Sequence, residues 1–246
     1  MPATQMTLTA AVELTRTGDL WLFRGRSAAD RAIQTLTNSP VNHVGMAVTI
    51  DDLPPLMWHA ELGRSLPDMW AGGHLRGVQL HVLADAVSVW GNRYGQRAWL
   101  RQLDHPVTPE MEDAALRTVA RLDGTPFPST AGLATRWARG RGRQRLQAIR
   151  GAGRAGVTGL LDGWRRAEDA TDGTAEGSSG LDNPLESAYC AEVVALTYQE
   201  MGLLPANRGP DSYDPGSFWS GDDLKLLGGA RLGREIEVVV PPAVGQ

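Results

Sequence analysis

Short runs of apolar and β-branched residues, separated by turn-forming residues, dominate the first hundred positions of this sequence. One run lies between Gly18 and Gly25, a second starts at His43, a third (LMWHAEL) follows the Asp51–Pro55 segment, and a fourth spans Gly77–Leu83. Runs of this length and composition are typical of β-strands. The second and third are joined by a turn rich in Asp and Pro, so we expect them to pair antiparallel. The chain is therefore predicted to build its core around a sheet.

Helices are predicted between and after these strands. Ser27 is a suitable N-cap for a helix of about three turns (ADRAIQTLT), and a short helix is expected near Asp85–Trp90. Pro109 begins a longer helix, for which Gly124 is a natural C-cap. The segments RAWLRQL and, near the C-terminus, REIEVVV add two further strands. Together these elements predict an α+β fold, and residues 1–246 are interpreted as a single domain with an insertion.

The insertion is residues 139–182, where charge and composition change abruptly. Nine arginines between positions 136 and 166 stand against the single acid Asp162, and six acids without a base follow in residues 168–186. The acidic stretch is rich in Gly, Ser and Thr, so we expect the insertion to be partly disordered, with some helix around VTGLLDGWRR. The charge blocks are interpreted as a solvated, partly self-neutralising excursion. The alternative is a weak contact of the arginine-rich part with an anionic membrane surface, or a lid over the site.

Charge and hydropathy exclude several classes of protein. The formal net charge of -4 and the acidic run beside the arginines argue against nucleic-acid binding. No stretch offers the roughly 20 uncharged apolar residues that a membrane-spanning helix needs. The N-terminal residues lack the basic and then apolar pattern of a secretory signal. We therefore expect a cytoplasmic protein.

Cys190 is the only cysteine in the sequence. A single cysteine excludes an intramolecular disulfide and a thiolate-rich metal site, so the thiol is either reactive or a small buried apolar group. The segment from Ser187 to Gly202 is predicted to form an amphipathic helix, which places Cys190 in the first turn. Unpaired N–H groups and the helix macrodipole at that position would stabilise a thiolate and an oxyanion.

A thiolate of this kind needs a base, and His43 is the candidate. It begins a strand directly after a turn, and a buried structural histidine is the alternative. Gly45 lies on the same face of the strand and leaves room for a neighbouring backbone or helix to come close, as expected if the cysteine-bearing helix packs across it. A third polar group must orient the base. His59 and Glu61 both suit this role, because they lie two apart on the neighbouring strand and so share a face.

The remaining histidines are His74, His81 and His105. They fall in a Gly-rich turn, at a polar position within a strand, and in a loop before a proline. All three are interpreted as structural or surface residues.

Four segments carry a family resemblance: GDLWLFRG, TNSPVNHVGMAV, MWHA and SAYCAEVVALTYQEMGLL. In this order they resemble the circularly permuted NlpC-type papain-like enzymes, the YiiX-like branch, over roughly residues 18–62 and 186–204. The resemblance implies a permuted papain-like fold, in which the histidine-bearing strands of an antiparallel sheet precede the cysteine-bearing helix packed against it. By position it implies Cys190 as nucleophile, His43 as base and His59 as third member, where the family more often has Glu. Glu61 remains the alternative third member.

The function implied by this resemblance is covalent acyl transfer. A thiol-protease-like hydrolase or acyltransferase would attack an amide, ester or thioester carbonyl of a small cytosolic peptide or an acyl lipid and pass through an acyl-enzyme. Such chemistry requires no metal or cofactor. The alternative is a catalytically inactive papain-like module that binds or interacts.

Overall fold

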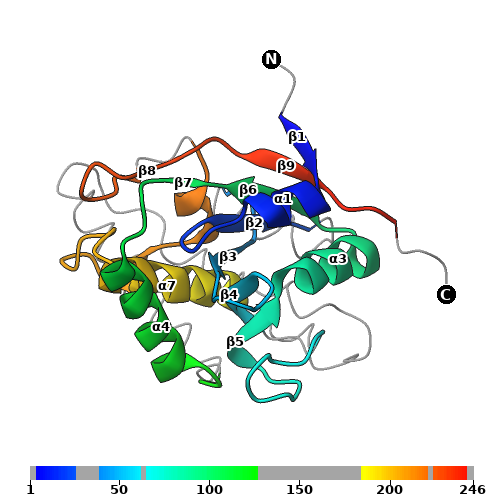
Figure 1. Ribbon diagram of the computed structural model, residues 1–246, viewed down its shortest axis with the longest axis horizontal. Helices are drawn as coiled ribbons and strands as arrows, with labels where there is room; N and C mark the ends of the chain where they lie inside the picture. Colours follow the sequence, from blue (N-terminus) through cyan, green and yellow to red (C-terminus); the bar gives the residue numbers. More distant parts are fainter. Residues whose placement is uncertain (1–3, 26–38, 62–64, 127–183, 221–223, 243–246) are drawn as a thin grey trace, which may run out of the picture.

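The computed structural model of the protein describes residues 4–25, 39–61, 65–126, 184–220 and 224–242, which are drawn in colour in Figure 1. For residues 184–188 it describes the backbone only. The helix predicted after Ser27 and the insertion predicted at residues 139–182 lie outside the described residues.

The described residues combine one large sheet with helices. The strands are β1 (Gln5–Thr7), β2 (Leu20–Arg24), β3 (His43–Val48), β4 (Leu56–Glu61), β5 (Gly77–Val82), β6 (Arg97–Arg101), β7 (Leu103–Asp104), β8 (Arg231–Leu232) and β9 (Ile236–Val239). The helices are α1 (Leu8–Leu14), α3 (Leu83–Tyr94), α4 (Pro109–Leu122) and α7 (Pro184–Glu200), with 3₁₀ turns η2 (Pro210–Ser212) and η3 (Pro215–Phe218). Every strand predicted from the sequence is present, and the mixture agrees with the predicted α+β class.

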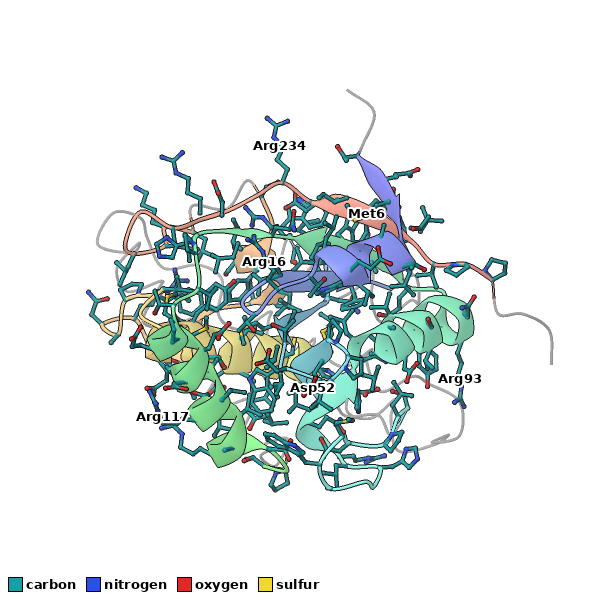
Figure 2. The ribbon with its side chains drawn as sticks, in the orientation of Figure 1. Met6, Arg16, Asp52, Arg93, Arg117 and Arg234 are labelled. Atoms are coloured by element: carbon teal, nitrogen blue, oxygen red, sulfur yellow. The ribbon has the colours of Figure 1, made fainter. Side chains whose placement is uncertain are left out.

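The sheet has seven strands in the order β1-β9-β6-β2-β3-β4-β5. The predicted antiparallel pairing of β3 with β4 is confirmed, with Met46 opposite Trp58. Their turn includes Asp52, which adopts a left-handed φ of 67° and is labelled in Figure 2. At the other edge β1 pairs parallel with β9, so the two ends of the described chain lie side by side (Figure 1).

Helix boundaries follow the local signals in most places. The helix predicted from Pro109 ends at Leu122, and Gly124 just beyond it has a φ of 71°, as a C-terminal glycine should. The short helix expected near Asp85–Trp90 is longer than predicted and ends before Gly95, whose φ is 63°. None of the helices among the described residues is long and apolar enough to cross a membrane.

Helices cover both faces of the sheet (Figure 1). α7 packs on β3 and β4 with α4 beside it, whereas α3 packs on β4, β5 and β6 with α1 beside it. Side chains alternate along a strand, so consecutive residues of β3 and β4 point to opposite helices. Val44, Met46 and Trp58 join the hydrophobic cluster that contains the α7 side chains, whereas Ala47 and Met57 join the cluster that contains α3.

The start of α7 corrects the prediction for the cysteine-bearing helix. The helix begins at Pro184 instead of Ser187, because proline suits the first helical position, where an N–H would lack a partner anyway. Cys190 is therefore the seventh residue and lies beyond the first turn, where the unpaired N–H groups are. The helix is also buried on most of its circumference from Tyr189 to Tyr198, so it is not amphipathic. The thiolate stabilisation expected from the helix N-terminus does not apply to Cys190.

Gly45 makes room for a neighbouring strand and not, as the sequence suggested, for the cysteine-bearing helix. A Cβ at this position would lie 2.3 Å from Met57 Sδ and 3.4 Å from His59 Cβ, both in β4. Because all these positions are buried, the methionine has little freedom to move away. Gly45 therefore sets how closely β3 and β4 side chains pack next to His59.

We expect Gly45→Ala to lower the free energy of unfolding by about 1–3 kcal/mol, as overpacking of a buried site usually does. Urea denaturation followed by tryptophan fluorescence measures the change. Gly73→Ala is the matched control, because a Cβ at Gly73 meets nothing within 4 Å. Equal stabilities of the two variants would contradict this account of Gly45.

Candidate functional site

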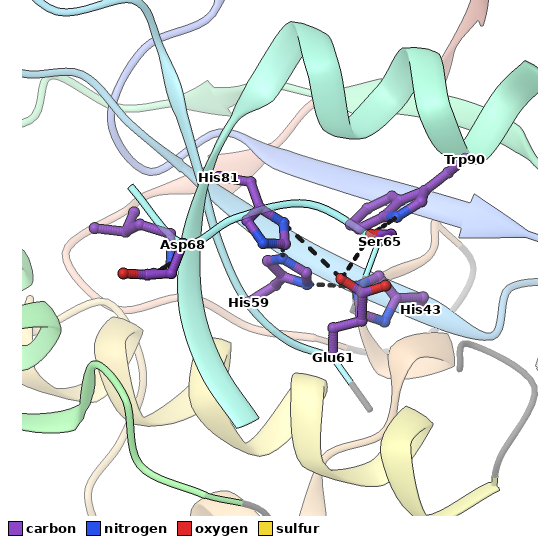
Figure 3. A network of polar contacts seen from close by, with 8 residues as sticks. His43, His59, Glu61, Ser65, Asp68, His81 and Trp90 are labelled. Carbon is purple, nitrogen blue, oxygen red and sulfur yellow. Dashed lines mark hydrogen bonds and ion pairs between the residues drawn. The ribbon is translucent and has the colours of Figure 1, made fainter. Parts of the chain in front are cut away.

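Three histidines and a glutamate gather on the face of the sheet that α3 covers. His43 begins β3, His59 and Glu61 lie in β4, and His81 lies in β5; all four side chains are buried. They share a face because paired residues of neighbouring strands, and residues an even number apart along one strand, point the same way. Met57 lies two residues before His59 and pairs with Ala47, four residues after His43, and with His81. Trp90 of α3 lies over them, with its ring centre 5.3 Å from that of His43 and 5.0 Å from that of His59 (Figure 3). We call His43, His59, Glu61 and His81 the His–Glu cluster.

The imidazoles of the cluster form a chain across three adjacent strands. His43 Nε2 lies 3.2 Å from His59 Nδ1, and His59 Nε2 lies 3.1 Å from His81 Nδ1. Each of these is a hydrogen bond in which one ring donates and the other accepts. Because a neutral imidazole carries one proton, the donor in the first bond fixes the donor in the second. The three rings therefore share one direction of hydrogen bonding.

Glu61 closes the cluster beside His81. Its Oε2 lies 3.9 Å from His81 Nδ1 and accepts a hydrogen bond of 3.0 Å from Ser65 Oγ. The indole Nε1 of Trp90 donates a hydrogen bond of 3.3 Å to Ser65 Oγ (Figure 3). Trp90 of α3 therefore fixes Ser65, which in turn donates to the Glu61 carboxyl group. Ligand atoms of His59, Glu61 and His81 all lie within 4.8 Å of one another, which is the spacing of a group that could hold a metal ion.

Several polar atoms on this face have no hydrogen-bond partner among the described residues. They include His43 Nδ1, His81 Nε2, Glu61 Oε1 and both side-chain polar atoms of Gln79, which pairs with His59 across β4 and β5. A buried polar group without a partner costs about 1–3 kcal/mol, so such atoms need an explanation in water, a ligand or a reacting group. His43 Nδ1 is the ring nitrogen that remains when Nε2 is used by His59.

Burial controls the charge of the cluster. Burial, and after it the neighbouring His81, lowers the pKa of His43 to about 3; burial lowers the pKa of His81 to about 4. The pKa of His59 is lowered well below 6.5 by burial and then by the two other rings. Burial raises the pKa of Glu61 to about 7, and the Ser65 hydrogen bond opposes this rise. At neutral pH the three rings are therefore neutral.

Cys190 lies on the other side of the sheet from the His–Glu cluster. Its side chain is fully buried in the hydrophobic cluster that includes Val44, which follows His43 in β3 and points the opposite way. The His43 ring packs instead on Phe23 and Trp90. The structure thus joins His43 with His59, while Cys190 belongs to the α7 side of the same strand.

Two residues of this site were not predicted from the sequence. His81 was interpreted as structural or surface; it lies buried, not at the surface, and is hydrogen-bonded to His59. Trp90 was not considered, because a tryptophan on a helix gives no signal of what it covers. The signal that could have found His81 is its parity: Gln79 and His81 are polar residues two apart in an apolar strand, and so share one face.

Comparison with solved structures finds only weak likeness. No family model matches the chain, and no curated protein matches it. The chain is similar to the crystal structure of metalloprotein yiiX from Escherichia coli O157:H7, with 17% sequence identity and a TM-score of 0.41. The match covers 76% of this chain and 66% of that chain, so this chain spans just under two thirds of its length. What this chain does must be derived from its own side chains.

Proposed function

We propose that the chain is a cysteine-dependent hydrolase or acyltransferase, with Cys190 as nucleophile, His43 as base and His59 as the residue that orients the base. The observation that carries this proposal is the 3.2 Å contact between His43 Nε2 and His59 Nδ1, together with the unpartnered Nδ1 of His43. A base needs one nitrogen fixed by a neighbour and the other open to the nucleophile. His43 meets the first condition, and its Nδ1 has no partner among the described residues; the second condition requires Cys190 to move to it.

The hydrogen-bond direction required by this role follows from the chain of imidazoles. For His43 Nδ1 to accept the thiol proton, Nε2 must carry the ring proton and donate it to His59 Nδ1. His59 Nε2 then carries a proton and donates to His81 Nδ1. This assigns His59 as the third member. Glu61, the alternative, lies beside His81, at 3.9 Å from its Nδ1, and acts on the far end of the chain.

The reaction itself would proceed in two steps. Cys190 gives its proton to His43 Nδ1, and the sulfur forms a bond to the carbonyl carbon of an amide, ester or thioester. The leaving group then takes the proton from His43, and the acyl-enzyme is released to water or another acceptor. The N–H of Cys190 is not assigned to the oxyanion, because it lies beyond the first turn of α7.

The proposal includes an opening step at the N-terminal part of α7. Cys190 is fully buried and His43 faces α3, so the sulfur must move toward the start of β3 to reach Nδ1. The same opening would admit water to His43, whose pKa burial holds at about 3. A neighbouring thiolate and better solvation both raise the pKa of an imidazole. The pair therefore becomes ionised only in the open state.

Fold and substrate class extend this proposal. The histidine-bearing strands β3 and β4 precede α7 along the chain and pack against it, as in a permuted papain-like arrangement. We propose a small peptide or acyl-lipid substrate in the cytoplasm, with no nucleic-acid partner. The weak membrane contact expected from the arginine-rich segment concerns residues outside the described part of the chain, and stays a prediction.

A second candidate function is a binding or interaction module without catalysis. The observation in its favour is the burial of Cys190 within an apolar cluster on the face away from His43. A cysteine in such a position is the ordinary small hydrophobic residue of a protein core. This candidate requires that the thiol react no faster than a buried structural cysteine.

Trapping of the acyl-enzyme tests the proposal. The full chain is incubated with an aryl ester, a peptide amide and an acyl thioester, and its intact mass is measured after a quench in acid. We expect the mass of one acyl group on the wild type, removable by hydroxylamine, and none on Cys190→Ala. His105→Ala, outside the cluster, is the matched control and should acylate like the wild type. No adduct with any of the three, or an equal adduct on Cys190→Ala, would favour the binding module.

A further inference from the structure

The proposed reaction uses His43 and His59 of the His–Glu cluster but gives Glu61 and His81 no role. We propose that His59, Glu61 and His81 bind a divalent transition-metal ion of the zinc type, and that an ion bound there prevents His43 from acting as the base. The binding half of this proposal stands on the three side chains alone. The inhibitory half rests on the proposed function.

The donor set and its spacing fit such an ion. Two imidazoles and one carboxylate are ligands that Zn²⁺ and its neighbours accept, whereas Mg²⁺ and Ca²⁺ prefer oxygen. His59 Nε2 and His81 Nδ1 are 3.1 Å apart, and Glu61 Oε2 is 3.9 Å from His81 Nδ1. Ligand atoms of a tetrahedral zinc site, with bonds of about 2.0–2.1 Å, lie roughly 3.4 Å apart. Small side-chain shifts therefore suffice to place all three on one ion.

The surroundings of Glu61 also favour a cation. Its carboxyl group is fully buried, and among the described residues no lysine or arginine forms an ion pair with it. Ser65 satisfies Oε2, but Oε1 has no hydrogen-bond partner there. A buried carboxylate is costly unless it is paired or coordinates a metal. The rings of His59 and His81 are neutral, so both can present a lone pair to the ion after a change of tautomer, without losing a proton.

The link to His43 follows from the tautomer of His59. A metal ion on His59 Nε2 uses the lone pair of that atom, so the ring proton must sit on Nδ1. Nδ1 then donates to His43 Nε2 across the 3.2 Å contact, and the remaining proton of His43 is forced onto Nδ1. An Nδ1 that already carries a proton cannot accept one from Cys190. The metal-bound and base-competent states are therefore mutually exclusive.

The burial of the three ligands separates this role from metal catalysis. The exposed fractions of His59, Glu61 and His81 are 0%, 0% and 1%, so a bound ion has no open side for a substrate. A catalytic metal keeps an open position. The two roles predict opposite effects of the ion on activity: a catalytic ion raises it, and the proposed ion lowers it.

Cobalt spectroscopy measures the binding half without any activity. Full-length protein freed of metal with EDTA is titrated with Co²⁺, and the visible d–d bands are followed; Zn²⁺ is then added as competitor. We expect one ion per chain, no effect of Mg²⁺, and a loss of affinity of at least about a hundredfold in Glu61→Gln and in His81→Ala. Glu61→Gln keeps the shape of the carboxyl group, so a fold defect in His81→Ala does not decide the result. His105→Ala and Cys190→Ala should bind as the wild type does.

Two results would overturn the metal site. One is binding that survives both Glu61→Gln and His81→Ala, which would place the ion elsewhere. The other is loss of binding in Cys190→Ala or a sulfur-to-cobalt charge-transfer band, which would place it on the thiol.

The inhibitory half is measured by the rate at which iodoacetamide labels Cys190. We expect saturating Zn²⁺ to slow labelling at least about tenfold in the wild type and to have no effect in Glu61→Gln. Activation by Zn²⁺, or equal slowing in both proteins, would overturn the switch. If labelling does not depend on His43 at all, the proposed function fails while the cobalt titration still decides the metal site.

Discussion

Replacing His43 by alanine is expected to lower kcat/KM for the acyl substrate on the order of a thousandfold, the usual contribution of a general base. The reason is that His43 Nδ1 has no hydrogen-bond partner among the described residues, while the ring is fixed from its other side by His59. The steady-state rate with the substrate that acylates the wild type gives the measurement. Cys190→Ala should lose at least as much, and the double variant should lose no more than the larger single loss, because nucleophile and base act as one unit.

The His59 variants separate positioning from a structural effect. His59→Ala removes the acceptor that holds the His43 tautomer, so we expect a smaller loss, roughly tenfold to a hundredfold, in kcat with little change in KM. The pH profile of kcat/KM should also shift, because the base would lose the ring that orients it. A His43→Ala variant that folds and retains wild-type kcat/KM would refute His43 as base. A His59→Ala variant changed in stability but not in pH profile would reduce His59 to a packing role.

Local chemistry explains why so much of the fold could be predicted. Strands β2 to β6 are apolar, β-branched runs closed by glycine, proline or aspartate, and these signals act within a few residues. The turn around Asp52 joins β3 directly to β4, so their antiparallel pairing needed no knowledge of the rest of the chain. In α4, Pro109 and Gly124 mark the two ends by their own backbone preferences.

The pairing of His43 with His59 was also predictable, because both lie on one face of neighbouring strands. Glu61 follows His59 on that face by the same alternation, but its neighbour His81 enters only through the register of β4 with β5. In that register Met57 lies opposite His81, so His59 reaches His81 diagonally. The sequence of β4 or of β5 alone does not predict this diagonal contact between His59 and His81.

The relation of Cys190 to His43 depends on tertiary packing and could not be derived locally. Sequence order places a cysteine-bearing helix after the histidine strands, but it does not say which face of the sheet the helix covers. α7 covers the face toward which Val44 points, and α3 covers the face of His43. The early start at Pro184 moved Cys190 away from the helix N-terminus by one turn. The parallel pairing of β1 with β9 brings together the first and last strands of the described chain, and no local signal predicts it.

Acid is expected to destabilise the metal-free protein through the buried histidines. The folded pKa values of His43 and His81 are about 3 and about 4, below the value of 6.5 for an unshifted histidine. Between pH 7 and pH 5 these histidines become protonated in the unfolded chain but stay neutral in the folded chain. The free energy of unfolding therefore falls as the pH falls. Each of these two residues removes about 2 kcal/mol of unfolding free energy over this window. The lowered pKa of His59 acts in the same direction.

Glu61 has the opposite effect on the free energy of unfolding. Variants of Glu61 and His81 therefore test the protonation states of the His–Glu cluster. The folded pKa of Glu61, about 7, lies above the ordinary 4.5, so the folded chain takes up a proton between pH 7 and pH 5 that the unfolded chain does not. Glu61 therefore adds about 2 kcal/mol of stability as the pH falls through the same window. Urea denaturation in EDTA at pH 7 and at pH 5 gives the difference in unfolding free energy for each variant.

The two variants should change that difference in opposite directions. His81→Gln removes one group that resists protonation, so the loss between pH 7 and pH 5 should shrink by about 2 kcal/mol. Glu61→Gln removes the opposing group, so the loss should grow by about as much. Gly73→Ala, which changes no titratable group and adds a Cβ that meets nothing within 4 Å, should leave it unchanged. Changes of the same sign in both cluster variants would mean that the rings and the carboxyl are not held in the folded protein in their neutral forms, and that the hydrogen-bonded chain from His43 to His81 does not exist as such.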